Sequence, residues 1–144
     1  MTNTSLRVRS AGAVIHAPDS IPVRPIDLAP GTRLALAEGT IEPGATYRPH
    51  AHRSIEQATY VLEGRVRVIS FDKDAGRPRS VVLEAGQTTL TPPGESLQLE
   101  CAGTTPARVL FITAPPYPAD HSDTVVLDRH RELTVEEMEV GTDR

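Results

Sequence analysis

The sequence predicts an all-β domain, built either as a sandwich or as a barrel. Turn-forming residues recur about every eight to twelve positions, from Pro30-Gly31 to Pro115-Pro116. The segments between them are short and rich in Val, Ile, Leu and Thr, which suit the pleated surface of a sheet. No segment with the period of an amphipathic helix interrupts them. Evenly spaced short strands of this kind are typical of antiparallel sandwiches and barrels.

Seven segments are expected to be strands: 33–41, 57–62, 65–71, 80–83, 88–91, 96–101 and 108–113. The clearest alternation is Arg65-Val66-Arg67-Val68, which places the valines on the buried face and the arginines in solvent. After these segments, Thr134 and Glu137 have the spacing of a capping box, which predicts a short helix at 135–140. A frayed tail is the alternative.

The chain of 144 residues has the usual size of one domain. We expect a single domain over 1–144, with a core at about 30–115, an N-terminal tail and a C-terminal extension over 118–144. No apolar run approaches the roughly 18 residues of a membrane helix, and the N-terminus lacks the apolar stretch of a signal peptide. A cytoplasmic location is therefore expected.

The composition of the chain limits the kinds of partner and of site that we expect. The formal net charge is −4 and basic residues form no cluster, which argues against a nucleic-acid or membrane partner and favours a small molecule. Cys101 is the only cysteine, which excludes an internal disulfide and a thiolate-rich zinc site.

The most informative block contains His50 and His52. In a strand, residues two apart share a face, so these two imidazoles can approach one metal ion. They stand in a frame of Gly44, His50, His52, Gln57 and Gly64, and a second frame of Gly86, Pro92 and Gly94 follows.

These frames resemble the two motifs of the cupin family. The first motif commonly has glutamate where this chain has Gln57, and the second has histidine and asparagine where this chain has Leu97 and Cys101. The resemblance covers roughly 33–113. It implies a double-stranded β-helix barrel of the jelly-roll type, a ligand site inside the barrel and a homodimer.

The resemblance also implies a metal site. His50, His52 and Gln57 would hold a divalent transition metal such as Fe, Mn, Ni or Zn, but Leu97 cannot act as the fourth ligand. Glu56 is the alternative to Gln57, since it is charged and only one of the two can face the histidines. Leu97 replaces the histidine ligand and Gln57 replaces the charged glutamate, so a site that works without metal is the alternative. In that site His50 and His52 would be the acid-base groups and Tyr60 a proton donor.

Further residues are expected around this site. Arg48 shares the strand parity of the histidines and could fix an anionic group. Leu97, Leu99 and Cys101 would form an apolar wall, which favours an apolar or aromatic substrate over a sugar. The remaining histidines, His16, His121 and His130, are expected to be solvated or locally hydrogen-bonded.

The leading hypothesis is a cupin enzyme that acts on a small metabolite. A metal centre would support isomerisation, cyclisation, lyase or oxygenation chemistry, whereas a site without metal could carry out the first three by proton transfer. The rival hypothesis is a non-catalytic module that binds a small ligand, and the missing histidine at Leu97 is its best support.

Overall fold

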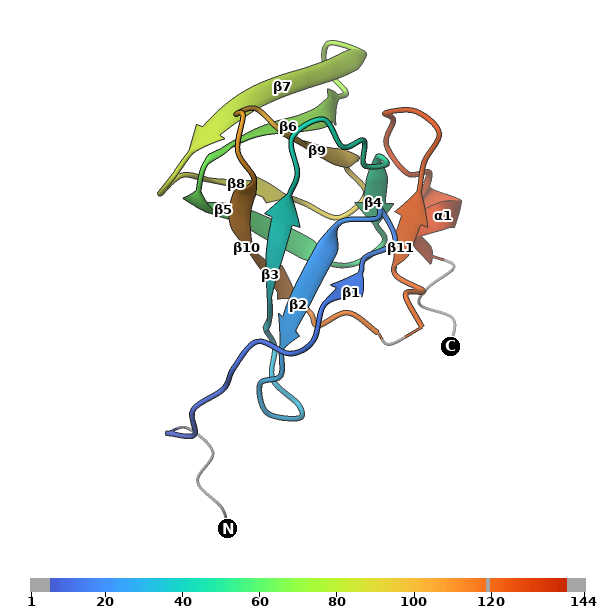
Figure 1. Ribbon diagram of the computed structural model, residues 1–144. Helices are drawn as coiled ribbons and strands as arrows, with labels where there is room; N and C mark the ends of the chain where they lie inside the picture. Colours follow the sequence, from blue (N-terminus) through green and yellow to red (C-terminus); the bar gives the residue numbers. More distant parts are fainter. Residues whose placement is uncertain (1–5, 119, 140–144) are drawn as a thin grey trace.

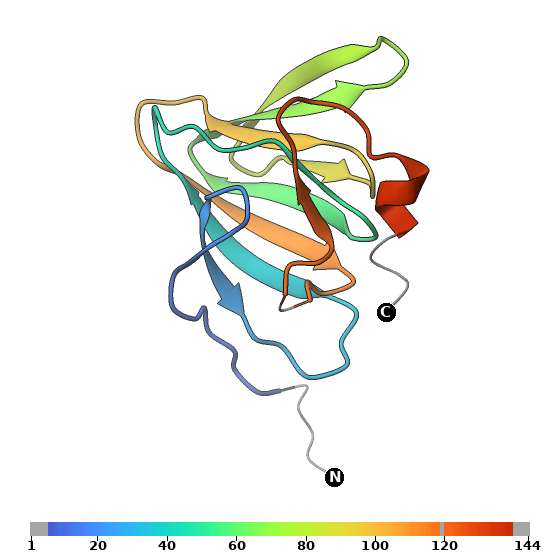
Figure 2. The ribbon, with the colours of Figure 1, turned by 90° about the vertical axis from the view of Figure 1, so that its right-hand side faces the viewer.

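The computed structural model describes residues 6–118 and 120–139, and two antiparallel β-sheets face each other in it (Figures 1 and 2). The first sheet has the order β1 (Ile15–His16), β2 (Pro22–Ile26), β3 (Ala35–Ile41), β10 (Ala107–Ala114), β5 (Glu56–Glu63) and β8 (Thr88–Thr91). The second has the order β11 (Thr124–Val126), β4 (His50–His52), β9 (Leu97–Cys101), β6 (Arg65–Asp72) and β7 (Arg77–Glu84). The prediction of an all-β jelly roll is confirmed.

The seven predicted strands correspond to β3 and to β5 through β10. Val66 and Val68 are buried as predicted, while Arg65 and Arg67 form exposed ion pairs with carboxylates of the neighbouring strands. Four strands lie outside those seven segments. Three of them, β1, β4 and β11, have two or three residues each, too few to show alternation, although the pairing of His50 with His52 assumes an extended strand at β4. The fourth, β2, contains two prolines, which interrupt a strand pattern.

Gly64 lets the chain pass from one sheet to the other, because it separates β5 in the first sheet from β6 in the second. Its φ of 85° lies in the left-handed region, and a Cβ there would approach the backbone of Ala107 to 3.0 Å. Only glycine satisfies both conditions without strain.

The core between the sheets is aliphatic. Six of its fully buried members lie on facing strands: Ile41, Val61, Val66, Leu97, Leu99 and Val109. Burying a side chain of this size contributes roughly 1.5–3 kcal/mol. Leu99 and Phe111 belong to this core and also line the cavity described below, so the barrel's packing and its cavity share walls.

The C-terminal segment covers the outer side of β4. Strand β11 pairs with β4, and Leu127 and Leu133 pack against Ala51. Helix α1 (Val135–Glu139) follows, and the predicted capping box forms: the backbone N–H of Glu137 donates to Thr134 Oγ1 at 3.1 Å, and that of Thr134 donates to Glu137 Oε1 at 3.0 Å. Residue 140 of the predicted helix lies outside the described residues. No helix in the described part of the chain could cross a membrane.

Candidate functional site

Strands β4 and β5 turn three polar side chains into the barrel. In β4, Ala51 packs outward under the C-terminal segment, so His50 and His52 point inward and are 6% and 4% exposed. In β5, Gln57 faces inward and is buried, whereas Glu56 lies on the exposed face. The structure therefore brings Gln57, and not Glu56, to the two histidines.

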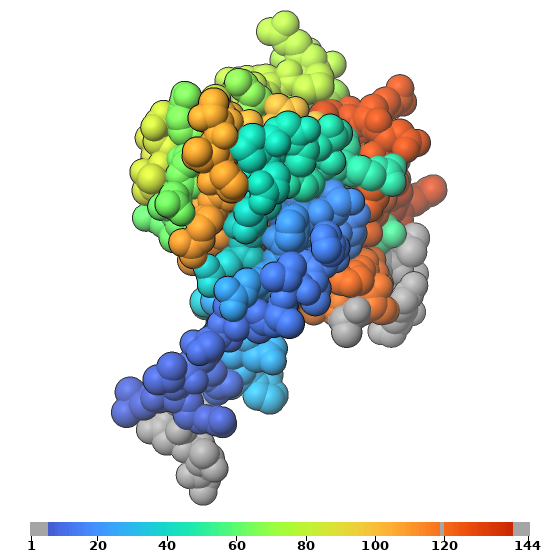
Figure 3. Space-filling model, viewed as in Figure 1, coloured from blue at the N-terminus to red at the C-terminus, as the bar shows by residue number. Residues whose placement is uncertain are grey.

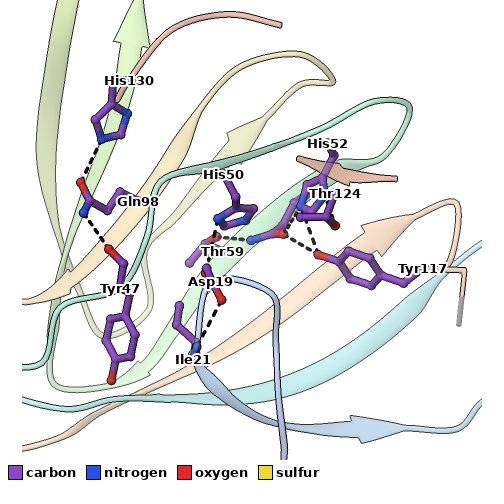
Figure 4. Close-up of polar contacts among 11 residues, drawn as sticks. Asp19, Ile21, Tyr47, His50, His52, Thr59, Gln98, Tyr117, Thr124 and His130 are labelled. Carbon is purple, nitrogen blue, oxygen red and sulfur yellow. Dashed lines mark hydrogen bonds and ion pairs between the residues drawn. The ribbon is translucent and has the colours of Figure 1, made fainter. Parts of the chain in front are cut away.

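A hydrogen-bonded network surrounds His52 (Figure 4). Its Nε2 lies 3.1 Å from Oε1 of Gln57 and 3.2 Å from the Tyr117 hydroxyl, which donates to the same Gln57 oxygen at 2.8 Å. Its Nδ1 lies 3.2 Å from Oγ1 of Thr124. An amide oxygen can only accept, so the contact with Gln57 requires the proton of His52 on Nε2, with Thr124 donating to Nδ1.

His50 faces a carboxyl group that the sequence analysis missed. Its Nδ1 lies 3.3 Å from Oδ2 of Asp19, although the two groups lack the alignment of a hydrogen bond. The backbone fixes Asp19, because its Oδ1 accepts from the N–H of Ile21 at 3.2 Å and its carbonyl accepts from the N–H of Arg48 at 3.2 Å. Asp19 lies between β1 and β2, where no motif marks it.

Burial sets the protonation of these groups. It lowers the pKa of His50 to about 4 and that of His52 to about 4, since a buried imidazolium loses its hydration. Burial raises the pKa of Asp19 to about 6 and that of the Tyr117 hydroxyl above its usual value. Although Tyr117 is 38% exposed, its hydroxyl end is turned inward. At neutral pH both imidazoles are therefore uncharged.

These groups form the polar inner end of a cavity of about 920 Å³. The remaining wall is largely apolar and comes from β2 and the residue before it, from β3, β9 and β10, and from the connection between β2 and β3: Ile21, Val23, Leu28, Leu34, Leu36, Leu99 and Phe111. The N-terminal segment and the segment after β10 also line the cavity, and in the space-filling view the blue and orange surfaces of these segments appear next to each other (Figure 3).

Four residues that the sequence analysis assigned to the site lie outside the cavity: Arg48, Tyr60, Leu97 and Cys101. The side chain of Arg48 is 54% exposed and pairs with Asp128 at 3.2 Å, because residues 45–49 are irregular and strand parity does not extend to it. Tyr60 is 37% exposed on the outer face of β5, since it shares the parity of Glu56. Neither side chain reaches the cavity, so neither can serve there as an anion anchor or a proton donor.

The other two belong to β9. Leu97 pairs in register with His50 but is packed into the core, and Cys101 lies at the strand end, where its Sγ contacts the carbonyls of Gly103 and Thr105. Of the predicted apolar wall, Leu99 lines the cavity.

The other three histidines differ in their surroundings. His16 is exposed, and His130 lies between Ser96 Oγ at 2.8 Å from its Nδ1 and Gln98 Oε1 at 2.9 Å from its Nε2. His121 lines the cavity on the segment that follows Tyr117.

The donors at the inner end suit a divalent ion of the transition series. Both histidines have Nδ1 beside an oxygen, Asp19 for His50 and Thr124 for His52, and an imidazole oriented in this way presents Nε2 as a ligand. The Thr124 hydroxyl can serve either tautomer of His52, because it both donates and accepts. Among the described residues no three His, Cys, Asp or Glu side chains converge, so Gln57 would have to complete the set.

The family model of the cupin domain matches residues 37–113, more than half of the chain. The chain belongs to the cupin family. An uncharacterized protein of Methanocaldococcus jannaschii, MJ1618, is 30% identical over 98 residues, which make up 68% of this cupin and 72% of that protein. Asp19, Tyr117 and Thr124 lie outside the matched region.

Two of the solved structures that are similar to this chain are oxalate decarboxylases. The enzyme of Bacillus subtilis, studied for its Mn(II) centers, has a TM-score of 0.65 and 26% identity. The aligned region covers 79% of this chain and 29% of the decarboxylase chain. The enzyme of Lactobacillus farciminis, in a formate complex, has a TM-score of 0.65 and 21% identity. The aligned region covers 80% of this chain and 33% of the decarboxylase chain. This cupin thus spans about a third of the length of those chains.

Proposed function

We propose that this cupin is an enzyme that acts on a small metabolite, with His50, His52 and Gln57 as its reactive end. The observation that carries the proposal is the convergence of these buried polar side chains at the inner end of a large, otherwise apolar cavity. Small-molecule sites are mostly apolar cavities with a few convergent polar groups, so such a cluster favours a role in binding or chemistry.

A divalent metal is part of this proposal, held by His50, His52 and Gln57. When bound, Fe, Mn, Ni or Zn would polarise a carbonyl or enolate oxygen, which suits isomerisation, cyclisation, lyase or oxygenation chemistry. The Mn(II) centers named for the Bacillus subtilis relative support this reading. Asp19 and Thr124 would orient the two imidazoles from outside.

A second candidate uses proton transfer without a metal, and the contact between Asp19 and His50 favours it. With Nδ1 facing the Asp19 carboxyl, Nε2 of His50 is the atom that would take a substrate proton, and the carboxylate would stabilise the imidazolium that forms. The Tyr117 hydroxyl would donate a hydrogen bond to the oxyanion that develops on the substrate.

Metal analysis separates the two candidates. Protein purified without chelator or affinity tag is assayed for bound metal and for a thermal shift on addition of Fe, Mn, Ni and Zn. We expect one ion per chain, lost in the His50→Ala/His52→Ala variant and retained in His16→Ala, which removes an exposed histidine outside the site. A stoichiometry well below one with no thermal shift would remove the metal version.

Turnover tests the enzyme itself. Wild-type protein and the His50→Ala/His52→Ala variant are incubated with a metabolite extract, and mass spectrometry compares the products. A product formed only by the wild type supports the enzyme, whereas ligand binding that is equal in both proteins, without any product, supports the non-catalytic module. The homodimer and the cytoplasmic location stay predictions, and sedimentation velocity tests the first.

A further inference from the structure

We infer that the cavity of the metal-free protein selects an uncharged, largely apolar molecule with one hydroxyl or carbonyl head, such as a phenol or an enolisable ketone. The inference rests on the proposed function, because it assigns a substrate class to the same cavity.

The shape and walls of the cavity favour a bulky apolar body. About 920 Å³ is near the upper end of the usual range for small-molecule sites, roughly 300–1,000 Å³, and has room for a ring system. Val23 of β2, Leu36 of β3, Leu99 of β9 and Phe111 of β10 line it with aliphatic and aromatic surface. A sugar or a short dicarboxylate would leave most of this surface without contacts.

The charges at the inner end disfavour an anionic head. Of the described residues that line the cavity, none is Lys, and Arg9 alone is Arg. Its guanidinium donates to the carbonyl of Leu28 at 2.8 Å, which holds it on the connection between β2 and β3. In the metal-free protein, a ligand carboxylate at the inner end would find no cation and would face the carboxyl of Asp19. An unpaired buried charge is costly, and a like charge nearby adds to the cost.

A neutral head finds partners. Thr113 is 2% exposed and lines the cavity, and its Oγ1 has no hydrogen-bond partner in the described protein. It pairs in register with Gln57 across β10 and β5, so its hydroxyl belongs to the same polar end. Together with the Tyr117 hydroxyl, it offers donors and acceptors of the kind that a ligand hydroxyl or carbonyl needs.

A matched ligand pair tests the inference. Isothermal titration calorimetry of the full chain, treated with chelator to remove any metal, compares naphthol with the corresponding naphthoate, which share a ring system and differ in the charge of the head. We expect naphthol to bind at least about tenfold more tightly. Asp19→Asn should reduce this preference severalfold, because it removes the carboxyl and keeps the shape. Asp27→Asn is the control, since it removes a carboxyl that lines the cavity on the connection between β2 and β3.

Equal or tighter binding of naphthoate would overturn the inference, as would failure of both ligands to bind. An unchanged preference in Asp19→Asn would overturn the assigned cause, and circular dichroism confirms that this variant is folded. The wild-type comparison decides the ligand class even if the variant does not fold. Neither ligand enters the metal and turnover assays above, so the proposed function stands or fails separately.

Discussion

The carboxyl of Asp19 lies 3.3 Å from Nδ1 of His50, and the two residues are 5% and 6% exposed. Asp19 precedes β2 at one end of the first sheet, whereas His50 begins β4 of the second. The contact therefore ties the N-terminal segment to the site across the interior of the barrel. Burial raises the pKa of Asp19 and lowers that of His50. The free energy of unfolding therefore depends on pH through both groups.

The first prediction concerns this pH dependence. The histidine pKa values fall from 6.5 to about 4 on folding, so their stabilisation is lost as pH decreases through that window. The Asp19 pKa rises from 3.8 to about 6, so its contribution is lost as pH increases and partly offsets the histidines. Asp19→Asn removes the offset. Its free energy of unfolding should fall more steeply between about pH 6 and 4.5, by about 1.4 kcal/mol per pH unit relative to wild type.

Urea denaturation at several pH values measures these slopes. Asp27→Asn is again the control, and parallel slopes for Asp19→Asn and wild type would contradict the prediction.

Thr113 provides the second prediction. Because its buried hydroxyl has no partner, Thr113→Val should raise the free energy of unfolding by about 1 kcal/mol, as it removes an unsatisfied polar atom at constant shape. The same variant should bind naphthol more weakly. Thr59→Val is the comparison, since the Thr59 hydroxyl accepts from Nε2 of Gln57 at 3.3 Å, and its loss should destabilise. Denaturation and calorimetry give both values, and a destabilised Thr113→Val would contradict the argument.

The sequence predicted the barrel and half of the site, for a physical reason. Strand alternation and turn residues are local signals, so β3 and β5 through β10 were predictable. Strand parity places His50 and His52 on one face, whereas the choice of Gln57 rests on the resemblance to the cupin motif. Asp19, Tyr117 and Thr124 reach the site through the packing of the end segments, and no local spacing records that packing.

Parity misled where the backbone is irregular or where both faces look alike. Arg48 precedes β4 outside any strand, so its distance from His50 says nothing about its direction. On β5 the outer face carries Tyr60 and Leu62, as apolar as the inner face, and polarity alone did not separate the faces. The burial of Gln57 resolves which face is which.

The third prediction concerns the His52 tautomer. The contact of Nε2 with Gln57 Oε1 places the proton on Nε2, so nitrogen NMR of labelled, metal-free protein at neutral pH should show a protonated Nε2 and a bare Nδ1. Saturating Zn should move the proton to Nδ1, where Thr124 Oγ1 accepts it. His16 supplies the control, because an exposed ring outside the site should not change. A proton on Nδ1 in metal-free protein would contradict the assignment.

The last prediction tests whether the C-terminal segment supports the site. His130 is bonded to Ser96 and Gln98, and Gln98 donates to the carbonyl of Tyr47 at 2.7 Å, so these contacts fasten the segment to β9. The same segment carries Thr124, which holds Nδ1 of His52. His130→Ala breaks both ring contacts and leaves Ser96, which is fully buried, without its partner, so it should cost about 1–3 kcal/mol of unfolding free energy. It should also weaken Zn binding, although His130 is not one of the proposed ligands. His16→Ala, at an exposed position, should change neither the stability nor the Zn affinity. Denaturation and metal titration measure the two effects, and a loss of stability with unchanged Zn affinity would show that the segment does not support His52.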